Sequence, residues 1–334
     1  MKKKSNAGKP SPKRRMPKNP GQIRVKCREA EGCYNFAGPE PKRFYQLETL
    51  GSSVEGLLNQ GDSWLMAVLR ESTQGLAPLA VTMEMLWENP YAMAFRVGAS
   101  VAQGRPGVIL LVCAKNHQEH SVRLEGEIES IRTLSARPES GILPVRGEGT
   151  FYLPNKHQRA DGKGRKVLAY ARAWTGPFAA TELRPSGQYV LVGKERRLLS
   201  VADSEAYGKA LAVALLKALD PVSRNAPSLN STHWGDVLCR VGRTGLTPAL
   251  LHCPRVTRYR SIQAYLKGML LWEPVPGSGV CPMQLVAPEL LAEAIRETLD
   301  PVIAAESVRR LSGPGGESDV PEAYVESLRA AMME

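Results

Sequence analysis

The sequence lacks any apolar run long enough to cross a membrane. Its longest continuous apolar stretch runs from Val108 to Ala114, whereas a membrane-spanning helix needs about 20 such residues. A secretory leader is also missing, because the basic N-terminus is followed by polar, proline-rich sequence and not by an apolar segment. The sequence therefore predicts an intracellular protein without a membrane partner. It would be cytoplasmic or nucleoid-associated, or nuclear in a eukaryotic or viral host.

The sequence also lacks the short motifs that mark common metal, cofactor and catalytic sites. Its six cysteines are scattered and form no C-x-x-C pair, which favours free thiols over disulfides or a zinc site. No G-x-x-x-x-G-K-[ST] loop, G-x-S-x-G elbow or H-E-x-x-H helix is present. We therefore predict no cofactor and no metal, assign no catalytic residue, and favour a binding protein over an enzyme.

Acidic residues are absent from the first 26 positions, which hold ten lysines or arginines. Because the whole chain has a net charge of +11, this arm carries all but one of the net positive charges. Such a block has little apolar surface to bury and repels itself, so we predict a disordered arm. The arm residues expected to contact a partner are Lys2, Lys3, Lys4, Lys13, Arg14, Arg15 and Lys18.

A polybasic arm binds polyanions because each phosphate that it neutralises releases a counterion. Nucleic acid is therefore the favoured partner of this chain. Three other roles stay open, namely a nuclear import signal centred on Lys13-Arg14-Arg15, improved solubility, and binding to anionic lipid. Lipid binding is the less attractive of these because the arm offers few apolar anchors before Ile23.

The body of the chain reads as an α+β fold, with a β-rich central region packed with N- and C-terminal helices. We divide the chain into residues 1–42 as a disordered polybasic arm and linker, 43–90 as a helical segment, 91–202 as a β-rich central domain, 203–312 as a helical domain, and 313–334 as a linker and peripheral C-terminal helix.

Apolar spacing places the individual elements. Helices are expected over residues 47–58, 64–69, 78–87, 204–219, 260–271, 288–299, 301–311 and 321–332, and strands over 93–97, 108–114, 141–145, 167–173, 188–191 and 197–201. Asp203 is expected to cap the helix that follows it. The stretch from Val122 to Leu134 fits a strand and a helix equally well, so its structure stays open.

A second basic region lies between Phe151 and Trp174. Cations that follow phosphates, beside aromatic faces that stack on bases, are typical of single-stranded nucleic-acid binding. The cations that we expect to contact nucleic acid here are Lys156, Arg159, Lys163, Arg165, Lys166 and Arg172. Each flanking aromatic residue, including Tyr152 and Tyr170, is more readily explained as part of the core.

A third basic stretch comprises Arg255, Arg258, Arg260 and Lys267, interleaved with Tyr259 and Tyr265, and its three arginines are the residues expected to contact nucleic acid. A solvated surface explains this stretch as well as a binding role does. Three separate basic stretches together favour a groove, however, because a groove needs contributions from several places. We therefore expect binding to the backbone of RNA or single-stranded DNA, with the chain acting as a subunit of a nucleoprotein assembly.

One order of features resembles the small lobe of protein-kinase-like phosphotransferases. Val97-Gly98-Ala99-Ser100 is followed by a turn over residues 104–107, then by Val112-Cys113-Ala114-Lys115, then by Glu127 or Glu129. In that family a glycine-rich turn covers the phosphates, and a strand lysine pairs with a helix glutamate. The resemblance also makes Asp236, in His233-Trp234-Gly235-Asp236, the catalytic base.

The departures from the family's pattern suggest an inactive relative as readily as an active one. The glycine-rich turn is incomplete, no asparagine stands five residues after Asp236, and Leu250-Leu251-His252-Cys253 stands where Asp-Phe-Gly is expected. A phosphotransferase or a pseudokinase is therefore the second hypothesis. The third is a protein–protein scaffold with a basic targeting tail, which would have no affinity for nucleic acid.

Overall fold

The computed structural model describes most of the chain from residue 22 onward. The described residues are 22–35, 46–89, 91–115, 119–153, 165–176, 178–184, 187–192, 195–232, 237–242, 245–250, 253, 255–274, 279–311 and 320–333. Residues 1–21 of the predicted disordered arm, which include its seven basic contact residues, lie outside this set. Among the described residues the chain combines separate helices with mainly antiparallel sheets, which confirms the predicted α+β class.

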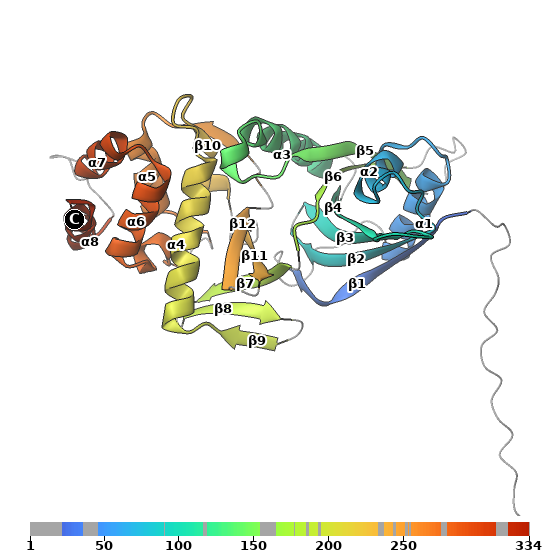
Figure 1. The fold of residues 1–334 in the computed structure, drawn as a ribbon, viewed down its shortest axis with the longest axis horizontal. Coiled ribbons are helices and arrows are strands. Elements are labelled where there is room, and N and C mark those ends of the chain that lie inside the picture. The colour runs from blue at the N-terminus through green and yellow to red at the C-terminus, as the bar shows by residue number, and fades with distance from the viewer. Residues whose placement is uncertain are drawn as a thin grey trace, which may run out of the picture.

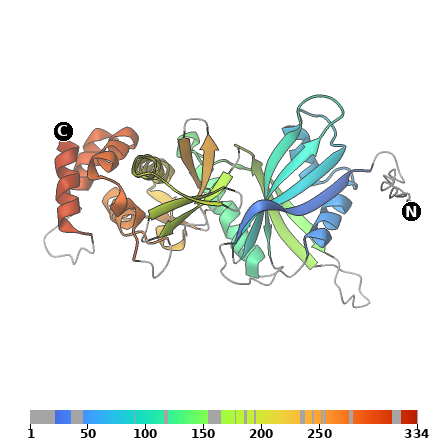
Figure 2. The same ribbon diagram turned by 90° about the horizontal axis from the view of Figure 1, so that it is seen from below.

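Two hydrophobic cores divide the described chain into two lobes that lie side by side (Figure 1). The first lobe comprises residues 22–173, and the second comprises residues 178–333. A short connection between Ala173 and Phe178 joins them. Figure 2 shows the same division from below, with the twisted sheet of the first lobe at one end and helices at the other. Ala218 and Cys253 pack into the first core, so the two lobes share an interface.

A six-stranded mixed sheet forms the centre of the first lobe. Its strands are β1 (Arg24–Asn35), β2 (Ala80–Glu88), β3 (Ala92–Ser100), β4 (Gly107–Ala114), β5 (Val145–Leu153) and β6 (Arg165–Ala173). Their spatial order is β1-β2-β3-β4-β6-β5, in which β1 and β2 are parallel and the other neighbours are antiparallel. β2, β3 and β4 therefore form a continuous meander.

Helices cover both faces of this sheet. Helices α1 (Leu47–Leu58) and α2 (Trp64–Ser72) lie on one face, where the Trp64 ring is 5.7 Å from the Phe151 ring of β5. Helix α3 (Glu119–Ser135) lies on the other face, where Tyr170 of β6 donates a hydrogen bond to Glu127. Since side chains alternate along a strand, this arrangement accounts for the burial of both faces of the central strands.

The second lobe contains two smaller sheets and the long helix α4 (Val201–Ala218). Strands β7 (Phe178–Arg184), β8 (Gly187–Val192), β9 (Glu195–Leu198), β11 (Val237–Gly242) and β12 (Gly245–Leu250) form an antiparallel sheet of order β12-β11-β7-β8-β9. Strands β10 (Asn225–Pro227) and β13 (Val256–Arg258) form a separate antiparallel pair. Helix α4 packs beside β12.

The remaining helices complete the second core. They are α5 (Ile262–Leu270), α6 (Pro288–Thr298), α7 (Pro301–Arg309) and α8 (Glu322–Met333), with short 3-10 turns at η1 (Pro138–Ser140), η2 (Leu229–Ser231) and η4 (Pro282–Leu285). Helix α8 packs on α6 and α7 and buries Val325, Leu328 and Ala331. The prediction that this last helix is peripheral is therefore wrong.

Two expectations for the first lobe are corrected. Residues 24–35 form β1, although the sequence assigned them to the arm and linker. Ile23, Val25 and Cys27 alternate inward against the body, and the cations between them masked this period-two pattern. The helix expected over 78–87 is strand β2, because Val81, Met83, Met85 and Trp87 are all buried, and this spacing of two is typical of a strand.

Other boundaries also differ from the expected ones. The open stretch from Val122 to Leu134 is part of helix α3, whose buried apolar residues follow the helical period. β5 starts at Val145, where the strand expected over 141–145 ends. Ser200, not Asp203, caps α4, and its hydroxyl accepts a hydrogen bond from the Asp203 amide.

The predicted domain limits are displaced for a tertiary reason. The expected β-rich domain over 91–202 is divided, since β3 to β6 belong to the first lobe while β7 to β9 pair with strands of the second. Strands β10 to β13 likewise fall inside the range expected to be helical. These limits depend on strand pairing between segments that are distant in the sequence. The local spacing of apolar residues cannot predict such pairing.

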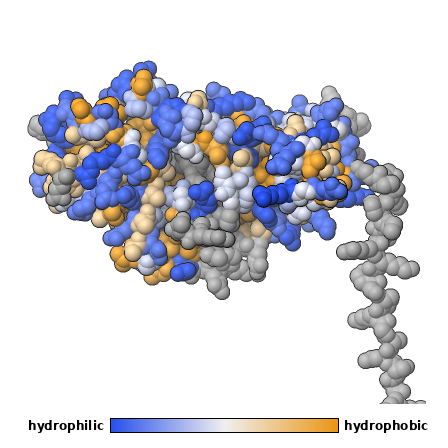
Figure 3. Space-filling model, viewed as in Figure 1, coloured by the Kyte–Doolittle hydropathy of each residue, from blue (hydrophilic) through white to orange (hydrophobic). Residues whose placement is uncertain are grey.

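The visible surface is mainly hydrophilic, and its apolar residues are scattered over both lobes (Figure 3). Among the helices that the structure describes, none combines the length and the hydropathy needed to cross a bilayer.

The packing of α2 on β5 leads to a stability prediction. A Cβ at Gly149 would lie 2.2 Å from two atoms of the Trp64 indole, so a side chain there displaces the ring. We expect Gly149→Ala to lower the free energy of unfolding by about 1–3 kcal/mol, as measured by urea denaturation. The matched control is Gly126→Ala on α3, where a Cβ meets nothing within 4 Å, and it should stabilise by about 0.5–1 kcal/mol. Equal effects of the two substitutions would contradict this packing.

Candidate functional sites

A buried ion pair closes one end of the first-lobe sheet. Lys115 follows the last residue of β4, and its Nζ lies 3.3 Å from Oε2 of Glu88, the last residue of β2. The side chains are only 2% and 5% exposed. The same ammonium donates a hydrogen bond of 3.0 Å to the carbonyl of Asn89. Because a charge buried in this way needs a partner, the pair fixes the ends of two strands relative to each other.

A second buried carboxylate lies on the neighbouring helix. Glu127 of α3 is fully buried and accepts two tyrosine hydrogen bonds, one of 2.7 Å from Tyr170 and one of 3.3 Å from Tyr91. Burial, reinforced by the negative charge of Glu127, raises the pKa of Tyr170 well above its usual value. The phenol therefore stays protonated and donates to the carboxylate at ordinary pH.

Arg172 extends this charged cluster toward the second lobe. It is two residues after Tyr170 on β6 and is 1% exposed. Burial lowers the pKa of its guanidinium, while Tyr170 and Glu127 act in the opposite direction. Since the pKa of arginine starts far above neutral pH, Arg172 remains a cation. Together these residues place two cations and two carboxylates inside the first lobe.

The kinase-like features are arranged in part as the resemblance implies. Lys115 directly follows the third strand of the β2-β3-β4 meander, and the next element is helix α3 with the buried Glu127. Protein kinases likewise carry their lysine on the third strand and its glutamate partner on the following helix. In this chain, however, the ion pair of Lys115 is with the strand residue Glu88, and Glu129 is exposed.

The pairing register explains why Lys115 and Glu127 are not aligned. Val112 is opposite Tyr170 in the β4–β6 ladder, so these two side chains lie on the same face, which α3 covers. Side chains alternate along a strand, and the positions of β4 that face α3 are therefore Val112 and Ala114. Lys115 lies one position beyond this set, at the end of the strand beside Glu88.

The glycine turn lies at the wrong end of the sheet for a phosphate loop. Gly104 lies in the connection from β3 to β4 and Gly107 is the first residue of β4, whereas Lys115 follows the opposite end of β4. Eight strand residues separate these ends by roughly 26 Å at about 3.3 Å per residue. This turn therefore cannot cover phosphates that Lys115 holds. The remaining element of the resemblance, His233-Trp234-Gly235-Asp236, lies outside the described residues.

The central basic region is described only at its edges. Lys156, Arg159 and Lys163 lie outside the described residues, and Arg165 is the first residue of β6. Lys166 is exposed, and its ammonium lies 5.6 Å from the centre of the Tyr152 ring. Arg172, predicted as a surface contact, is instead in the interior.

The aromatic residues that flank this region are mostly core residues. Phe151 and Tyr170 are buried, and Trp174 is half-buried with the Arg96 guanidinium 5.9 Å from its ring centre. Tyr152 is 58% exposed. Of these four rings, Tyr152 alone presents a largely exposed face, so a row of stacking platforms is not formed here.

The third basic stretch is on the surface of the second lobe. Arg255, Arg258 and Arg260 are exposed and lie on or beside β13. β13 pairs with β10, in a register that places Asn225 opposite Arg258. Within the described part of the chain, no ion pair neutralises these three side chains. They form what we call the arginine strand.

The sequence did not identify Glu88, Tyr91 and Arg240 as site residues. Glu88 ends a strand that was expected to be a helix, and this error concealed its position beside Lys115. Arg240 is a single exposed cation on β11, and no local pattern distinguishes it from an ordinary surface residue. Only the fold brings these residues to their neighbours.

Comparison with known proteins adds no assignment, since no family model and no curated protein matches this sequence. Function therefore has to be inferred from the geometry of this chain's own residues.

The buried ion pair leads to a second stability prediction. Lys115→Met leaves Glu88 buried without its ion-pair partner, and we expect the free energy of unfolding to fall by about 3–5 kcal/mol. Adding Glu88→Gln to that variant removes the buried charge and should restore part of the loss. Arg146→Met, which breaks an exposed pair with Glu71, is the control and should cost at most about 1 kcal/mol. In a double-mutant cycle, the changes in the free energy of unfolding caused by Lys115→Met and Glu88→Gln should not be additive. Additive changes would show that the two residues do not interact.

Proposed function

We propose that this chain is a kinase-like protein that acts by binding and does not catalyse phosphoryl transfer. The order of a three-strand meander, a lysine, a helix with a buried glutamate and two further strands supports the kinase-like part. A second lobe that follows a short connection, and that combines helices α4 to α8 with two small sheets, is compatible with it. This is the pseudokinase form of the second hypothesis.

The observation that carries the inactive part is the enclosure of Lys115. Its side chain is 2% exposed and its ammonium is paired with Glu88, whereas a catalytic kinase lysine has to reach the phosphates of ATP. The glycine turn at the far end of β4 and the absence of Asp-Phe-Gly in the sequence support the same conclusion. Without these parts neither the phosphates nor the magnesium ions are positioned.

An assay of nucleotide chemistry tests this proposal. With Mg-ATP, we expect neither autophosphorylation nor phosphorylation of a general protein substrate. We also expect ATP affinity to be unchanged in the Lys115→Met/Glu88→Gln double variant, whose folding is checked by circular dichroism. Phosphoryl transfer by the unmodified chain, lost in this double variant, would contradict the proposal and would restore the active form of the hypothesis.

A second function, binding to the backbone of nucleic acid, is favoured by the contrast between the arginine strand and the ion-paired arginines elsewhere on the surface. The first lobe neutralises many of its surface arginines, with ion pairs at Arg24, Arg28, Arg96, Arg132, Arg137 and Arg146. The arginine strand has no such acidic partners among the described residues. Exposed guanidinium groups without an acidic partner suit phosphate oxygens.

The N-terminal arm supplies the larger part of this affinity in our proposal. The eight cations of residues 1–21 give salt-dependent attraction to any phosphate backbone, and the arginine strand adds a fixed contact on the folded body. RNA and single-stranded DNA are both compatible with such backbone contacts. The kinase-like body then serves as a scaffold, in which the nucleic acid and other protein subunits meet.

Fluorescence anisotropy over a salt series separates the arm from the body. Relative to the full chain, removal of residues 1–21 should weaken binding to single-stranded RNA and make the salt slope shallower. In the full chain, replacing Arg255, Arg258 and Arg260 with Gln should lower the slope by about 2, at roughly 0.7 for each lost phosphate contact.

The control for the arginine strand is a triple Gln variant of Arg132, Arg146 and Arg309. These arginines are exposed but already ion-paired, so the loss of charge is the same while the slope should hardly change. An equal fall of the salt slope in both triple variants would mean that binding depends only on the total charge of the chain. Binding that is independent of salt would exclude the backbone mode altogether.

A further inference from the structure

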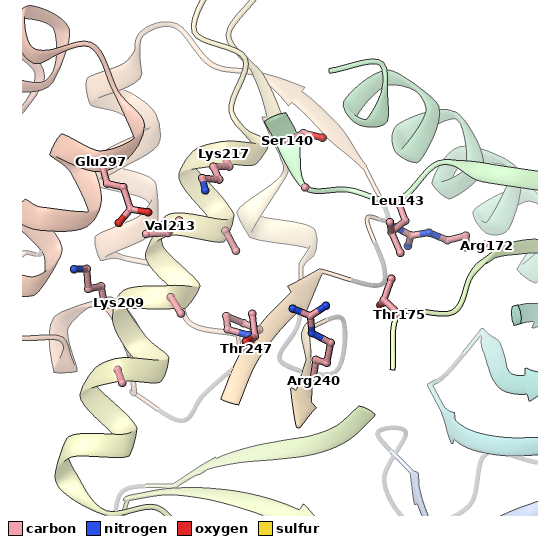
Figure 4. A pocket seen from close by; sticks show the side chains of 15 residues that line it. Ser140, Leu143, Arg172, Thr175, Lys209, Val213, Lys217, Arg240, Thr247 and Glu297 are labelled. Carbon is pink, nitrogen blue, oxygen red and sulfur yellow. The ribbon is translucent and has the colours of Figure 1, made fainter. Parts of the chain in front are cut away.

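A pocket of about 550 Å³ lies on the seam between the two lobes (Figure 4). The second lobe contributes one face of α4 and the β11–β12 hairpin. The first lobe contributes Ser140, Gly141 and Leu143, at the end of η1 and just after it. Thr175, in the connection between the lobes, also lines the pocket. A ligand held here would therefore contact both lobes at once.

Helix α4 lines the pocket with a row of small apolar side chains. Ala206, Ala210 and Ala214 are spaced four residues apart, and Val213 is three residues after Ala210, so they share one face of the helix. Ala210, Val213 and Ala214 are only half-buried, which leaves apolar surface open to the pocket. Pro248 adds to this wall from β12. The wall suits the apolar part of a ligand, and its small side chains leave room for a flat ring.

Arg240 of β11 supplies a positive charge on the hairpin side of the pocket. Figure 4 shows its side chain directed toward the space beside α4. A Cβ at Gly176 would lie 3.5 Å from Cδ of Arg240, so the stem of the arginine lies against the connection between the lobes. The side chain is exposed, and within the described part of the chain it has no ion-pair partner. Its guanidinium can therefore donate two parallel hydrogen bonds to an anionic group.

Two other cations of the lining are already engaged. Arg172 is 1% exposed and interacts with Tyr170 and Glu127 in the interior of the first lobe. Lys209 pairs with Glu293 at 2.5 Å. We therefore assign neither side chain a contact with a ligand.

The remaining charges of the pocket favour an anion on the side of Arg240. Lys217 is exposed in the last turn of α4 and has no ion-pair partner among the described residues. Glu297 is the one acid among the described lining residues. It lies on the other side of α4 from Arg240 in Figure 4, so no carboxylate of the lining opposes an anion beside Arg240.

We infer that this pocket binds a small, mainly apolar molecule that carries one anionic group, such as an aromatic carboxylate. The anionic group would lie at Arg240 and the apolar part against α4. The volume falls in the range of about 300–1,000 Å³ that small-molecule sites occupy, and an apolar wall with a few polar groups is typical of such sites. The pocket includes neither Lys115 nor the arginine strand, so the inference does not rest on either proposed function.

Isothermal titration calorimetry of the full chain with matched probes tests this inference. The probes are 2-naphthoate, its uncharged amide and the cation 2-naphthylmethylammonium, with acetate as an anion that lacks the ring. We expect saturable binding of 2-naphthoate. The amide should bind about three- to tenfold more weakly, because it loses one charge-assisted contact at a partly exposed site. The ammonium and acetate should bind more weakly still, since Arg240 repels the first and the second leaves the apolar wall empty.

Two substitutions separate the charged contact from the apolar wall. Arg240→Gln should remove the preference for 2-naphthoate over its amide and leave the affinity for the amide unchanged. Ala210→Phe, which fills the space beside α4 without a change in charge, should weaken both probes by at least about tenfold through the loss of apolar contact. Circular dichroism checks the fold of each variant. Because Arg240 is exposed, its result stands even if Ala210→Phe does not fold.

Each substitution has a matched control outside the pocket. Arg197→Gln makes the same charge change at an exposed position on β9, and Ala202→Phe adds the same ring at an exposed position in the first turn of α4. Both controls should leave the two affinities unchanged. The inference is overturned if 2-naphthoate does not bind saturably, if Arg197→Gln removes its preference as fully as Arg240→Gln does, or if the two phenylalanine variants behave alike.

Discussion

The buried ion pair between Lys115 and Glu88 is the interaction on which the first lobe depends. It joins the C-terminal ends of β4 and β2 across β3. The chain leaves the sheet at this end to enter α3. Beside it, Glu127 anchors α3 to the sheet through Tyr170 and to the start of β3 through Tyr91. Buried charges are tolerated only when they are paired and hydrogen-bonded. The ends of β2 and β4, helix α3 and the start of β3 are therefore held together.

The same constraint shapes what this chain can do. A lysine that holds two strand ends together cannot also move to bind the phosphates of a nucleotide. The kinase-like order of elements is thus kept, while its central cation has a structural role. Other cations lie in the N-terminal arm and on the arginine strand. Their positions support the proposal that this chain binds phosphate groups and does not transfer them.

Local sequence patterns predicted those elements whose structure depends mainly on residues near to them in the chain. The strands at 93–97 and 108–114 and the helices after Pro288 and Pro301 follow from apolar spacing and from proline at a first helical turn. β1 and β2 were missed, because the cations of β1 hid its alternation and the methionines of β2 are also good helix formers. The candidate sites were less predictable, since Lys115 meets Glu88, and Arg172 joins Tyr170 and Glu127 in the interior, only through strand pairing and the packing of α3 on the sheet. Glu127 could be singled out from the sequence, but its tyrosine partners could not.

Amine-reactivity mapping of the native chain tests the enclosure of Lys115 most directly. The full protein would be acetylated briefly and the extent of modification at each lysine measured by mass spectrometry, with and without Mg-ATP. Reaction at a buried group requires local opening, so Lys115 should react at least roughly 100-fold more slowly than the exposed Lys217 and Lys166, with no effect of Mg-ATP on Lys115. If Lys115 reacts as fast as these residues, or is selectively shielded by Mg-ATP, it is an open nucleotide contact and its structural role beside Glu88 is contradicted.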